Sequence, residues 1–560
     1  MEYQQIASKR EKIAYFSMEI GISNEIHTYS GGLGVLAGDT IRSSADLKLP
    51  LVAVTLVSKK GYFKQEITHN GRQIEHSQEW NPSEFMRLLP TETTVKIQNR
   101  NVKIRTWVYE LKSVTGGVVP VLFLDTDIEG NAPEDREITF FLYGGDEKYR
   151  LKQEIVLGIG GVRILDALGY KIRKYHMNEG HSSFLALELL RKYKMDVEKV
   201  RESCIFTTHT PVEAGHDKFP YDVVGEIMGE DTDLEILKRF GGYDRLNMTR
   251  LALNLSNYIN GVAKRHRDVS REMFPGYEIH AITNGIHSYT WTCESFRKIY
   301  DEHLPGWAND PNLLVKVDSI PDEEIWQAHK KAKRVLIDYV NNATNVGMDY
   351  NTLTLGFARR ATEYKRANLL FSDVEKLRKV NRRGKLQAIF AGKAHPKDES
   401  GKRLIKEVFD QIERLKGEIK MAYLENYNMD LAAKLVSGVD VWLNTPLRPM
   451  EASGTSGMKA AHNGVIYFSV LDGWWIEGWI EGVTGWAIGP APEERKRMPI
   501  EEQLAMELND LYGKLEYVIV PLYYGRRDEW IKIMENSIGK LASHFNSHKM
   551  MHRYVTEAYL

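Results

Sequence analysis

The sequence predicts an α/β protein made of two lobes, each a Rossmann-like, doubly wound parallel sheet. Short apolar runs of strand length, rich in β-branched residues, alternate along the chain with longer segments of helical periodicity. This alternation is typical of parallel sheets that are covered by helices on both faces. The 560 residues are also enough for roughly two to four domains. We therefore expect one lobe over residues 1–290 and another over residues 291–560, facing a cleft.

The expected strands share an apolar composition and are bounded by turn residues: residues 13–17, 51–57, 118–124, 204–208, 352–358, 386–391 and 439–444. Ser319 precedes Pro321 and a group of acids, which predicts the start of a helix. We expect this helix to continue to about residue 340 and to connect the two lobes. A last helix, about residues 527–547, could return to the first lobe.

The composition favours a globular protein that acts on small molecules. Hydrophobic residues make up 42% of the chain and charged residues 27%, which excludes a disordered or collagen-like protein. With 75 Lys and Arg against 76 Asp and Glu, the chain has no basic field that would hold nucleic acid. Cys204 and Cys293 do not form a CxxC pair, so neither a disulfide framework nor a cysteine-rich zinc site is expected. No signal-peptide pattern or apolar run of membrane length occurs, so we expect a cytoplasmic protein without a membrane partner.

A glycine-rich segment from Tyr29 to Asp39, YSGGLGVLAGD, follows an expected strand and leads into a helix. Its glycines allow backbone N–H groups to approach an anion closely, and the helix N-terminus adds a favourable dipole. We therefore expect this segment to bind a phosphate or a sugar hydroxyl. The spacing is not that of a dinucleotide-binding GxGxxG loop, and a plain tight turn would also need glycines.

A second segment, PMEASGTSGMKAAH, follows the strand expected at residues 439–444 and contains Lys459. Its small and hydroxyl residues form a nest of donors at the carboxyl end of a parallel strand, where such sheets bind ligands. The spacing of Gly454 and Lys459 differs from that of an NTP-binding P-loop. A lysine desolvated beside other cations can react with the aldehyde of a cofactor, and pyridoxal phosphate carries both an aldehyde and a phosphate. The alternative is a surface turn with an ordinary solvated lysine.

Basic residues and histidines supply further candidates. Arg360 and Lys365 follow another expected strand and could clamp a phosphate, although a solvated basic face is the alternative. His176 and His181 lack HExxH spacing, so we expect no metal site there or elsewhere. His209 lies at a strand end, where it could make a polar contact with a ligand or a structural hydrogen bond.

Together these segments resemble the α-glucan phosphorylases, the glycogen, starch and maltodextrin phosphorylases that use pyridoxal phosphate. The matching residues occur in the family's order across nearly the whole chain: Gly31–Gly34, His176–His181, Thr208–Thr210, Asn260–Lys264, Thr283–Ile286, Arg360, Glu363–Arg366, Glu425–Tyr427, Glu451–Thr455, Met458 and Lys459. The resemblance implies the glycosyltransferase B architecture, which agrees with the two expected lobes.

The resemblance also implies roles for single residues. Lys459 would carry pyridoxal 5'-phosphate, and the residues expected around that cofactor are Thr455, Ser456, Gly32, Tyr427 and Arg359. The expected catalytic residues besides Lys459 are Arg360 on the substrate phosphate, Lys365 nearer the cofactor, and His209 beside the scissile bond. The residues expected to bind the terminal glucose and its surroundings are Glu451, Ser453, Asn284, Leu33 and Gly31.

Several positions depart from the family's pattern. The chain is shorter than full-length members and begins at the first strand of the core, so control through an N-terminal segment is not expected, and the assembly stays open between a homodimer and other homo-oligomers. Thr362 stands where many members have histidine, Arg359 replaces a usual lysine, and Ser456-Gly457 replaces Gly-Asn.

The expected reaction is phosphorolysis of an α-1,4-glucan, which releases α-glucose 1-phosphate with retention of configuration. Glycosidic cleavage usually employs two carboxylates, but Glu451 stands alone in its motif, so phosphate itself is expected to act as the acid, with the cofactor phosphate as its proton partner. One alternative is a nucleotide-sugar-dependent glucan synthase of the same fold, which has no use for a cofactor-bearing lysine. Another is a glucan-binding protein that has lost catalysis.

Overall fold

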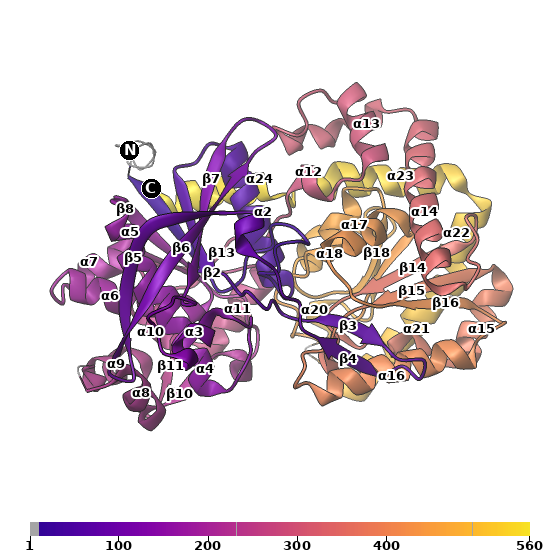
Figure 1. Ribbon diagram of the computed structural model, residues 1–560. Coiled ribbons are helices and arrows are strands. Elements are labelled where there is room, and N and C mark those ends of the chain that lie inside the picture. Colours follow the sequence, from indigo (N-terminus) through magenta and orange to yellow (C-terminus); the bar gives the residue numbers. More distant parts are fainter. Residues whose placement is uncertain (1–10, 231, 496) are drawn as a thin grey trace. The chain divides into compact units, whose positions relative to one another are not determined.

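The computed structural model describes residues 11–560 with the exception of residues 231 and 496 (Figure 1). The chain divides into two compact units. The first contains the chain up to Phe63, together with Ser77–Thr283 and Met550–Leu560, and the second contains Lys64–His76 and Asn284–Lys549. No helix among the described residues has both the length and the apolarity that crossing a membrane requires.

The first unit contains a nine-stranded sheet with the order β13-β12-β9-β8-β1-β2-β7-β6-β5. In this order the strands are His280–Ala281, Tyr258–Gly261, Cys204–Thr207, Ile172–Asn178, Lys12–Ser17, Leu51–Leu56, Val118–Asp125, Arg100–Lys112 and Arg87–Ile97. The strands from β13 to β7 are parallel, and β6 and β5 add an antiparallel edge. Successive strands spread from β1 toward β7 on one side and from β8 toward β13 on the other, so the order reverses between β1 and β8.

Helices surround this sheet in the first unit (Figure 1). They are α2 (Gly32–Asp46), α3 (Pro133–Arg136), α4 (Glu147–Ile155), α5 (Gly161–Ala167), α6 (Phe184–Lys192), α7 (Val197–Ser203), α8 (Tyr221–Met228), α9 (Leu234–Gly241), α10 (Met248–Asn254) and α11 (Lys264–Met273). A small antiparallel pair, β10 (Lys218–Pro220) and β11 (Arg245–Asn247), lies outside the main sheet.

Successive residues of β1 and β2 pack on opposite faces of the main sheet. Phe16 and Val54 belong to one apolar core, and Tyr15 and Ala53 belong to the other. Because both faces are buried, these strands are continuous apolar runs, which is why their positions can be predicted from the sequence.

The C-terminal end of the chain belongs to the first unit, where Tyr554 and Tyr559 complete one of its two cores. The Tyr559 hydroxyl lies 2.8 Å from His176 Nδ1, and His176 Nε2 lies 2.8 Å from the Thr207 hydroxyl. His176 is therefore a structural histidine, and both of its ring nitrogens are used inside the unit.

The second unit contains a six-stranded parallel sheet with the order β16-β15-β14-β17-β18-β19. In this order the strands are Lys420–Leu424, Leu386–Ala391, Leu353–Ala358, Val441–Asn444, Ile466–Val470 and Gly485–Ile488. Numbered along the chain from β14, this is the doubly wound order 3-2-1-4-5-6, and it reverses between β14 and β17. The expected strand at residues 386–391 is confirmed by β15.

Helices also surround the sheet of the second unit (Figure 1). They are α12 (Ser288–Trp291), α13 (Glu294–His303), α14 (Asp322–Thr344), α15 (Val374–Arg383), α16 (Glu399–Arg414), α17 (Met429–Gly438), α18 (Ser456–Ala461), α19 (Trp475–Gly478), α20 (Pro492–Arg495), α21 (Ile500–Lys514), α22 (Val520–Gly525) and α23 (Arg527–Asn536). A π-helical turn at Ser537–Ala542 follows, and α24 (Ser547–Tyr554) starts in the second unit and ends in the first.

The predicted connector helix differs from the structure in its start and in its place. α14 begins at Asp322 after Pro321, and the Ser319 hydroxyl donates to the Lys316 carbonyl instead of capping the helix. The whole of α14 lies inside the second unit, so it does not link two lobes.

A β-hairpin near the N-terminus, β3 (Lys64–Ile67) and β4 (Gln73–His76), belongs to the second unit. The side-chain amide of Gln65 donates to the Gly392 carbonyl at 2.8 Å, and that of Gln73 donates to the Ala394 carbonyl at 2.9 Å. These hydrogen bonds attach the hairpin to the segment that follows β15.

Candidate active site

In the second unit the predicted phosphate-binding residues lie where the strand order reverses. Arg359 and Arg360 follow β14 directly, and Glu451 belongs to the segment between β17 and α18. Open α/β sheets bind ligands at the carboxyl ends of strands on either side of such a reversal. Arg360 is exposed, whereas Arg359 and Glu451 are largely buried.

Glu451 joins two of the predicted cations. Its carboxylate accepts a charge-assisted hydrogen bond from the Arg359 guanidinium, and its Oε1 lies 3.2 Å from Lys365 Nζ. Burial alone would raise the pKa of Glu451, but the charges of Arg359 and Lys365 outweigh it and lower the pKa to about 2. Glu451 is therefore ionised, and the three side chains form a buried group in which two basic residues surround one carboxylate.

Neighbouring strand ends fix this charged group in place. The Asn444 side chain, at the end of β17, accepts from Arg359 and donates to Tyr467 OH at 2.6 Å. Asp472, which follows β18, accepts from the Glu451 amide at 2.9 Å. Burial raises the pKa of Asp472 to about 6, and the nearby Glu451 charge adds to that rise.

Ser453 Oγ and Asn284 Oδ1, both at positions predicted to bind glucose, are among ten buried side-chain polar atoms of this unit that have no hydrogen-bond partner within the described residues. Gly454 follows Ser453 with φ of +89°, a backbone conformation that glycine adopts without strain. A buried polar atom without a partner costs stability unless a ligand or water satisfies it.

Lys459, on α18, is 7% exposed. Its Nζ lies 3.8 Å from the centre of the Trp291 ring, on α12. The Asn463 side-chain amide donates to the carbonyl of Lys459 at 3.0 Å and to the carbonyl of Trp291 at 2.8 Å. Asn463 thus links the backbone of Lys459 to the backbone of Trp291.

Of the other residues predicted around the cofactor, Ser456, Thr455 and Tyr427 follow β16 and β17 of this sheet, whereas Gly32 belongs to the first unit. Ser456 begins α18, and its hydroxyl accepts from Trp442 Nε1 at 3.0 Å. Thr455 stands at the N-terminus of the same helix, and Tyr427 is half-buried in the segment between β16 and α17.

In the first unit the glycine-rich segment is held by a carboxylate that the sequence did not single out. Glu19 follows β1, and its Oε2 accepts from the amides of Ser30 at 2.6 Å and of Gly31 at 3.2 Å. A Cβ atom at Gly31 or Gly32 would meet no atom within 4 Å, so the space beside these glycines is open. Leu33, the third predicted residue here, is half-buried on the first turn of α2.

His209 lies just beyond the end of β9, near the end of β8, on the other side of the strand reversal from Glu19. Its amide donates to Glu179 Oε2 at 2.8 Å, and its Nε2 lies 2.7 Å from Asn178 Oδ1. Since an amide oxygen only accepts, Nε2 carries the proton. Burial lowers the pKa of His209 to about 4, although Glu179 opposes the change.

Four residues of these sites were not singled out from the sequence: Glu19, Trp291, Asp472 and Asn463. Glu19 and Asp472 follow strands β1 and β18, which is the one signal that could have found them. Trp291 carries no such signal, because it meets Lys459 only through tertiary packing, and Asn463, four residues after Lys459, follows no strand end.

Comparisons with known proteins identify the family to which the chain belongs. The family model for carbohydrate phosphorylases matches residues 216–482. A maltodextrin phosphorylase of Thermococcus litoralis is 41% identical, over 98% of this chain and 70% of the relative. A glycogen phosphorylase of Aquifex aeolicus is 36% identical, over 98% of this chain and 86% of the relative. An uncharacterized protein of Methanocaldococcus jannaschii is 30% identical, over 98% of this chain and 99% of its own length. The chain thus belongs to the α-glucan phosphorylases of the carbohydrate phosphorylase family.

Proposed function

We propose that this enzyme cleaves an α-1,4-glucan with inorganic phosphate and releases α-glucose 1-phosphate with retention of configuration. The observation that carries the proposal is the buried group of Arg359, Lys365 and Glu451 at the strand reversal of the second unit. It holds two basic side chains in place beside Arg360 against one carboxylate, which suits a phosphate.

The acid that protonates the leaving oxygen must have a proton to give near neutral pH. Glu451 cannot supply one, because its pKa is about 2. Asp472 is a weaker acid, but both of its oxygens accept amide hydrogen bonds, from Glu451 and from Gly473. His209 is neutral near pH 7, since its pKa is about 4. The substrate phosphate is the remaining proton source, and we assign it that role.

We propose that the first unit binds the glucan and that the second unit binds the phosphate and the cofactor, as the two lobes of a glycosyltransferase B fold. His209 would offer a sugar hydroxyl a neutral, oriented imidazole, and Gly31, Gly32 and Leu33 would provide the open space beside it. Ser453 and Asn284 would satisfy their unpartnered oxygens with glucose hydroxyls, and the ionised Glu451 would accept from another.

The residues near Lys459 fit pyridoxal phosphate. A buried lysine amine over an aromatic ring suits a planar aromatic aldehyde, and Arg359 with the N-terminal turn of α18 suits its phosphate. Lys459 would hold the cofactor covalently, with Thr455, Ser456 and Tyr427 around it. When bound, the cofactor supplies a second phosphate group that can share a proton with the substrate phosphate. Arg360 would hold the substrate phosphate for that exchange, and Lys365 would lie nearer the cofactor.

The test is release of glucose 1-phosphate from maltodextrin and inorganic phosphate, with the absorbance of bound pyridoxal phosphate as a second readout. Lys459→Ala should lose the absorbance band and the activity together. Lys416→Ala, at a lysine whose side chain is 76% exposed, is the matched control and should keep both. Glucose 1-phosphate release by the Lys459→Ala protein, or release of free glucose without phosphate by the unaltered enzyme, would refute the proposal.

A further inference from the structure

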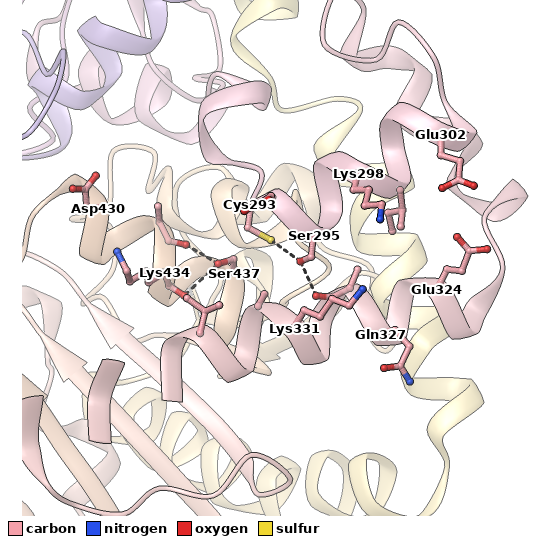
Figure 2. A pocket seen from close by; sticks show the side chains of 16 residues that line it. Cys293, Ser295, Lys298, Glu302, Glu324, Gln327, Lys331, Asp430, Lys434 and Ser437 are labelled. Carbon is pink, nitrogen blue, oxygen red and sulfur yellow. Dashed lines mark hydrogen bonds between the residues drawn. The ribbon is translucent and has the colours of Figure 1, made fainter. Parts of the chain in front are cut away.

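A cavity lies in the second unit between α13, α14 and α17, apart from the residues of the candidate site (Figure 2). Its volume is about 690 Å³, within the range of small-molecule sites. Its apolar lining comes from small and branched side chains: Cys293, Ile299, Ala328, Ala332, Val335 and Ala433. None of the residues to which a role is assigned above lines it.

Each of the three helices contributes one lysine to the lining of this cavity: Lys298 from α13, Lys331 from α14 and Lys434 from α17. No ion pair joins any of the three to an acidic side chain within the part of the chain that the structure describes. Lys434 lies over the ring of Tyr339, with 5.7 Å between Nζ and the ring centre. The cavity therefore combines an apolar lining with three ammonium groups that lack carboxylate partners.

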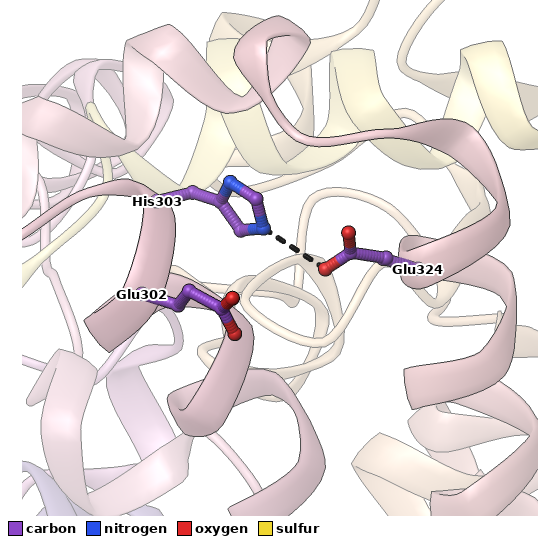
Figure 3. A group of neighbouring side chains, drawn as sticks. All are labelled: Glu302, His303 and Glu324. Carbon is purple, nitrogen blue, oxygen red and sulfur yellow. Dashed lines mark hydrogen bonds and ion pairs between the residues drawn. The ribbon is translucent and has the colours of Figure 1, made fainter.

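The acidic residues of the lining are distributed differently. Asp430 and Glu294 stand in the first turns of α17 and α13, where the helix N-terminus stabilises a negative charge. Glu302 and Glu324 lie together at one end of the cavity, and Lys331 lies between this end and Asp430 (Figure 2). Figure 3 shows that Glu324 has a partner in His303, whose Nε2 lies 2.9 Å from Glu324 Oε2.

Hydrogen bonds connect this cavity with the backbone of Lys459. The amide of Cys293, a lining residue, donates to Asn463 Oδ1 at 2.8 Å. The side-chain amide of Asn463 in turn donates to the carbonyls of Lys459 and Trp291. The buried side chain of Asn463 thus joins the start of α13 to α12 and α18. A displacement of α13 would therefore shift the backbone of Lys459.

We propose that the cavity binds an organic anion with an apolar body, and that its occupancy is transmitted to the Lys459 segment through Asn463. The apolar lining would hold the body of the ligand, and Lys298, Lys331 and Lys434 would hold its acidic group. A neutral molecule of the same shape would bind less well, because it would gain no electrostatic attraction from the three ammonium groups.

The first experiment uses 8-anilinonaphthalene-1-sulfonate as the probe and the thiol of Cys293 as the reporter. Cys204 is 1% exposed in the core of the first unit, so monobromobimane should label Cys293 alone, and Cys293→Ser should abolish the labelling. Burial raises the pKa of the Cys293 thiol, so labelling is followed at mildly alkaline pH. Glu302, His303 and Glu324 offer ligand atoms within 4.8 Å of one another, which could coordinate a contaminating metal ion. EDTA is therefore present throughout.

The sulfonate should slow the labelling of Cys293 in a saturable way, and the uncharged analogue N-phenyl-1-naphthylamine should protect it at least ~5-fold less well. Lys331→Glu should weaken protection by the sulfonate ~5-fold or more, whereas Lys330→Glu should leave it within ~2-fold. Lys330 is an exposed neighbour on the same helix that does not line the cavity, so both variants change the net charge equally. Absence of protection, or equal effects of the two variants, would overturn the assigned site.

The second experiment follows amide hydrogen exchange in the presence and absence of the sulfonate. Binding should slow exchange in peptides from α13, α14 and α17 and also in residues 456–464. In Asn463→Ala the slowing should remain in the three helices and disappear from residues 456–464. Unchanged exchange of residues 456–464 in the unaltered protein would refute the connection. Neither readout uses the cofactor or the glucan, so their failure is distinct from failure of the proposed phosphorolysis.

Discussion

The carboxylate of Glu451 pairs with the guanidinium of Arg359, two residues that are 92 positions apart in the chain and follow different strands of one sheet. Lys365 shares the same carboxylate. In the absence of a phosphate, Glu451 is thus the anion that these two cations hold. The carboxylate therefore weakens the attraction that these cations exert on a phosphate bound nearby.

Glu451→Gln tests this effect of the carboxylate. The amide keeps the shape and one acceptor of the carboxylate but removes its charge, so the uncompensated charges of Arg359 and Lys365 should strengthen the binding of phosphate at the neighbouring Arg360. We expect the KM for phosphate to fall about 2- to 10-fold, while kcat/KM for the glucan falls because the hydroxyl contact weakens. Initial rates at varied phosphate and varied maltodextrin measure both. Glu413→Gln, at an exposed acid, is the control, and a raised KM for phosphate in Glu451→Gln would contradict that effect.

Asp472 should make the stability of the enzyme depend on pH. Burial raises its pKa in the folded protein to about 6, above the ordinary value of 3.8, so folding favours the protonated acid. Its contribution is fully present below about pH 4 and is lost as the pH rises through about 6, with a total of about 3 kcal/mol. Asp472→Asn removes this titration. As the pH rises from about 4 to about 6, the melting temperature of the unaltered protein should therefore fall relative to that of Asp472→Asn. A difference that stays constant over this range would show that Asp472 does not titrate there.

His209 should remain neutral throughout the range in which a free histidine becomes charged. Its pKa of about 4 is set first by burial, so the imidazole gains no proton as the pH falls from about 8 to about 5. NMR of selectively labelled histidines, with His209→Asn to assign the signal, measures this directly. A titration midpoint of His209 near the ordinary value of 6.5 would make His209 a possible general acid. It would also weaken the case for phosphate as the proton donor.

Gly32 and Gly38 of the glycine-rich segment should respond oppositely to alanine. A Cβ atom at Gly32 would meet nothing within 4 Å, so Gly32→Ala should fold with nearly unchanged stability and lose activity only by narrowing the ligand's space. A Cβ atom at Gly38 would lie 2.0 Å from the Gly21 carbonyl oxygen, which forces the backbone apart and should cost about 1–3 kcal/mol or more. Thermal unfolding and glucose 1-phosphate release together separate the two effects. Equal destabilisation by both changes would contradict this division of roles.

The sequence was informative where a local pattern determines structure. Continuous apolar runs such as β15 locate buried parallel strands, and the segments after them carry the candidate site because ligands bind at strand ends. The hairpin of β3 and β4 has no such pattern. Its strands are polar, and Gln65 and Gln73 attach it to carbonyls more than three hundred residues away.

The same limit applies to the candidate site. Lys459 and Glu451 lie in glycine- and serine-rich segments that are recognisable from their composition. The ring of Trp291 beneath Lys459 and the carboxylate of Glu19 behind Ser30 belong to ordinary-looking segments. Their contribution arises only when distant parts of the chain pack together, which a single sequence does not encode locally.

The position of residues 550–560 has a consequence for biosynthesis. This segment follows the whole second unit in the chain, yet Tyr554 and Tyr559 fill the core of the first unit and hydrogen-bond Thr207 and His176. A ribosome therefore synthesises this segment of the first unit only after the whole second unit. Until then, the apolar surface that Tyr554 and Tyr559 cover stays exposed in the nascent chain, where chaperones can bind it. The first unit therefore completes its core after the second unit has been synthesised.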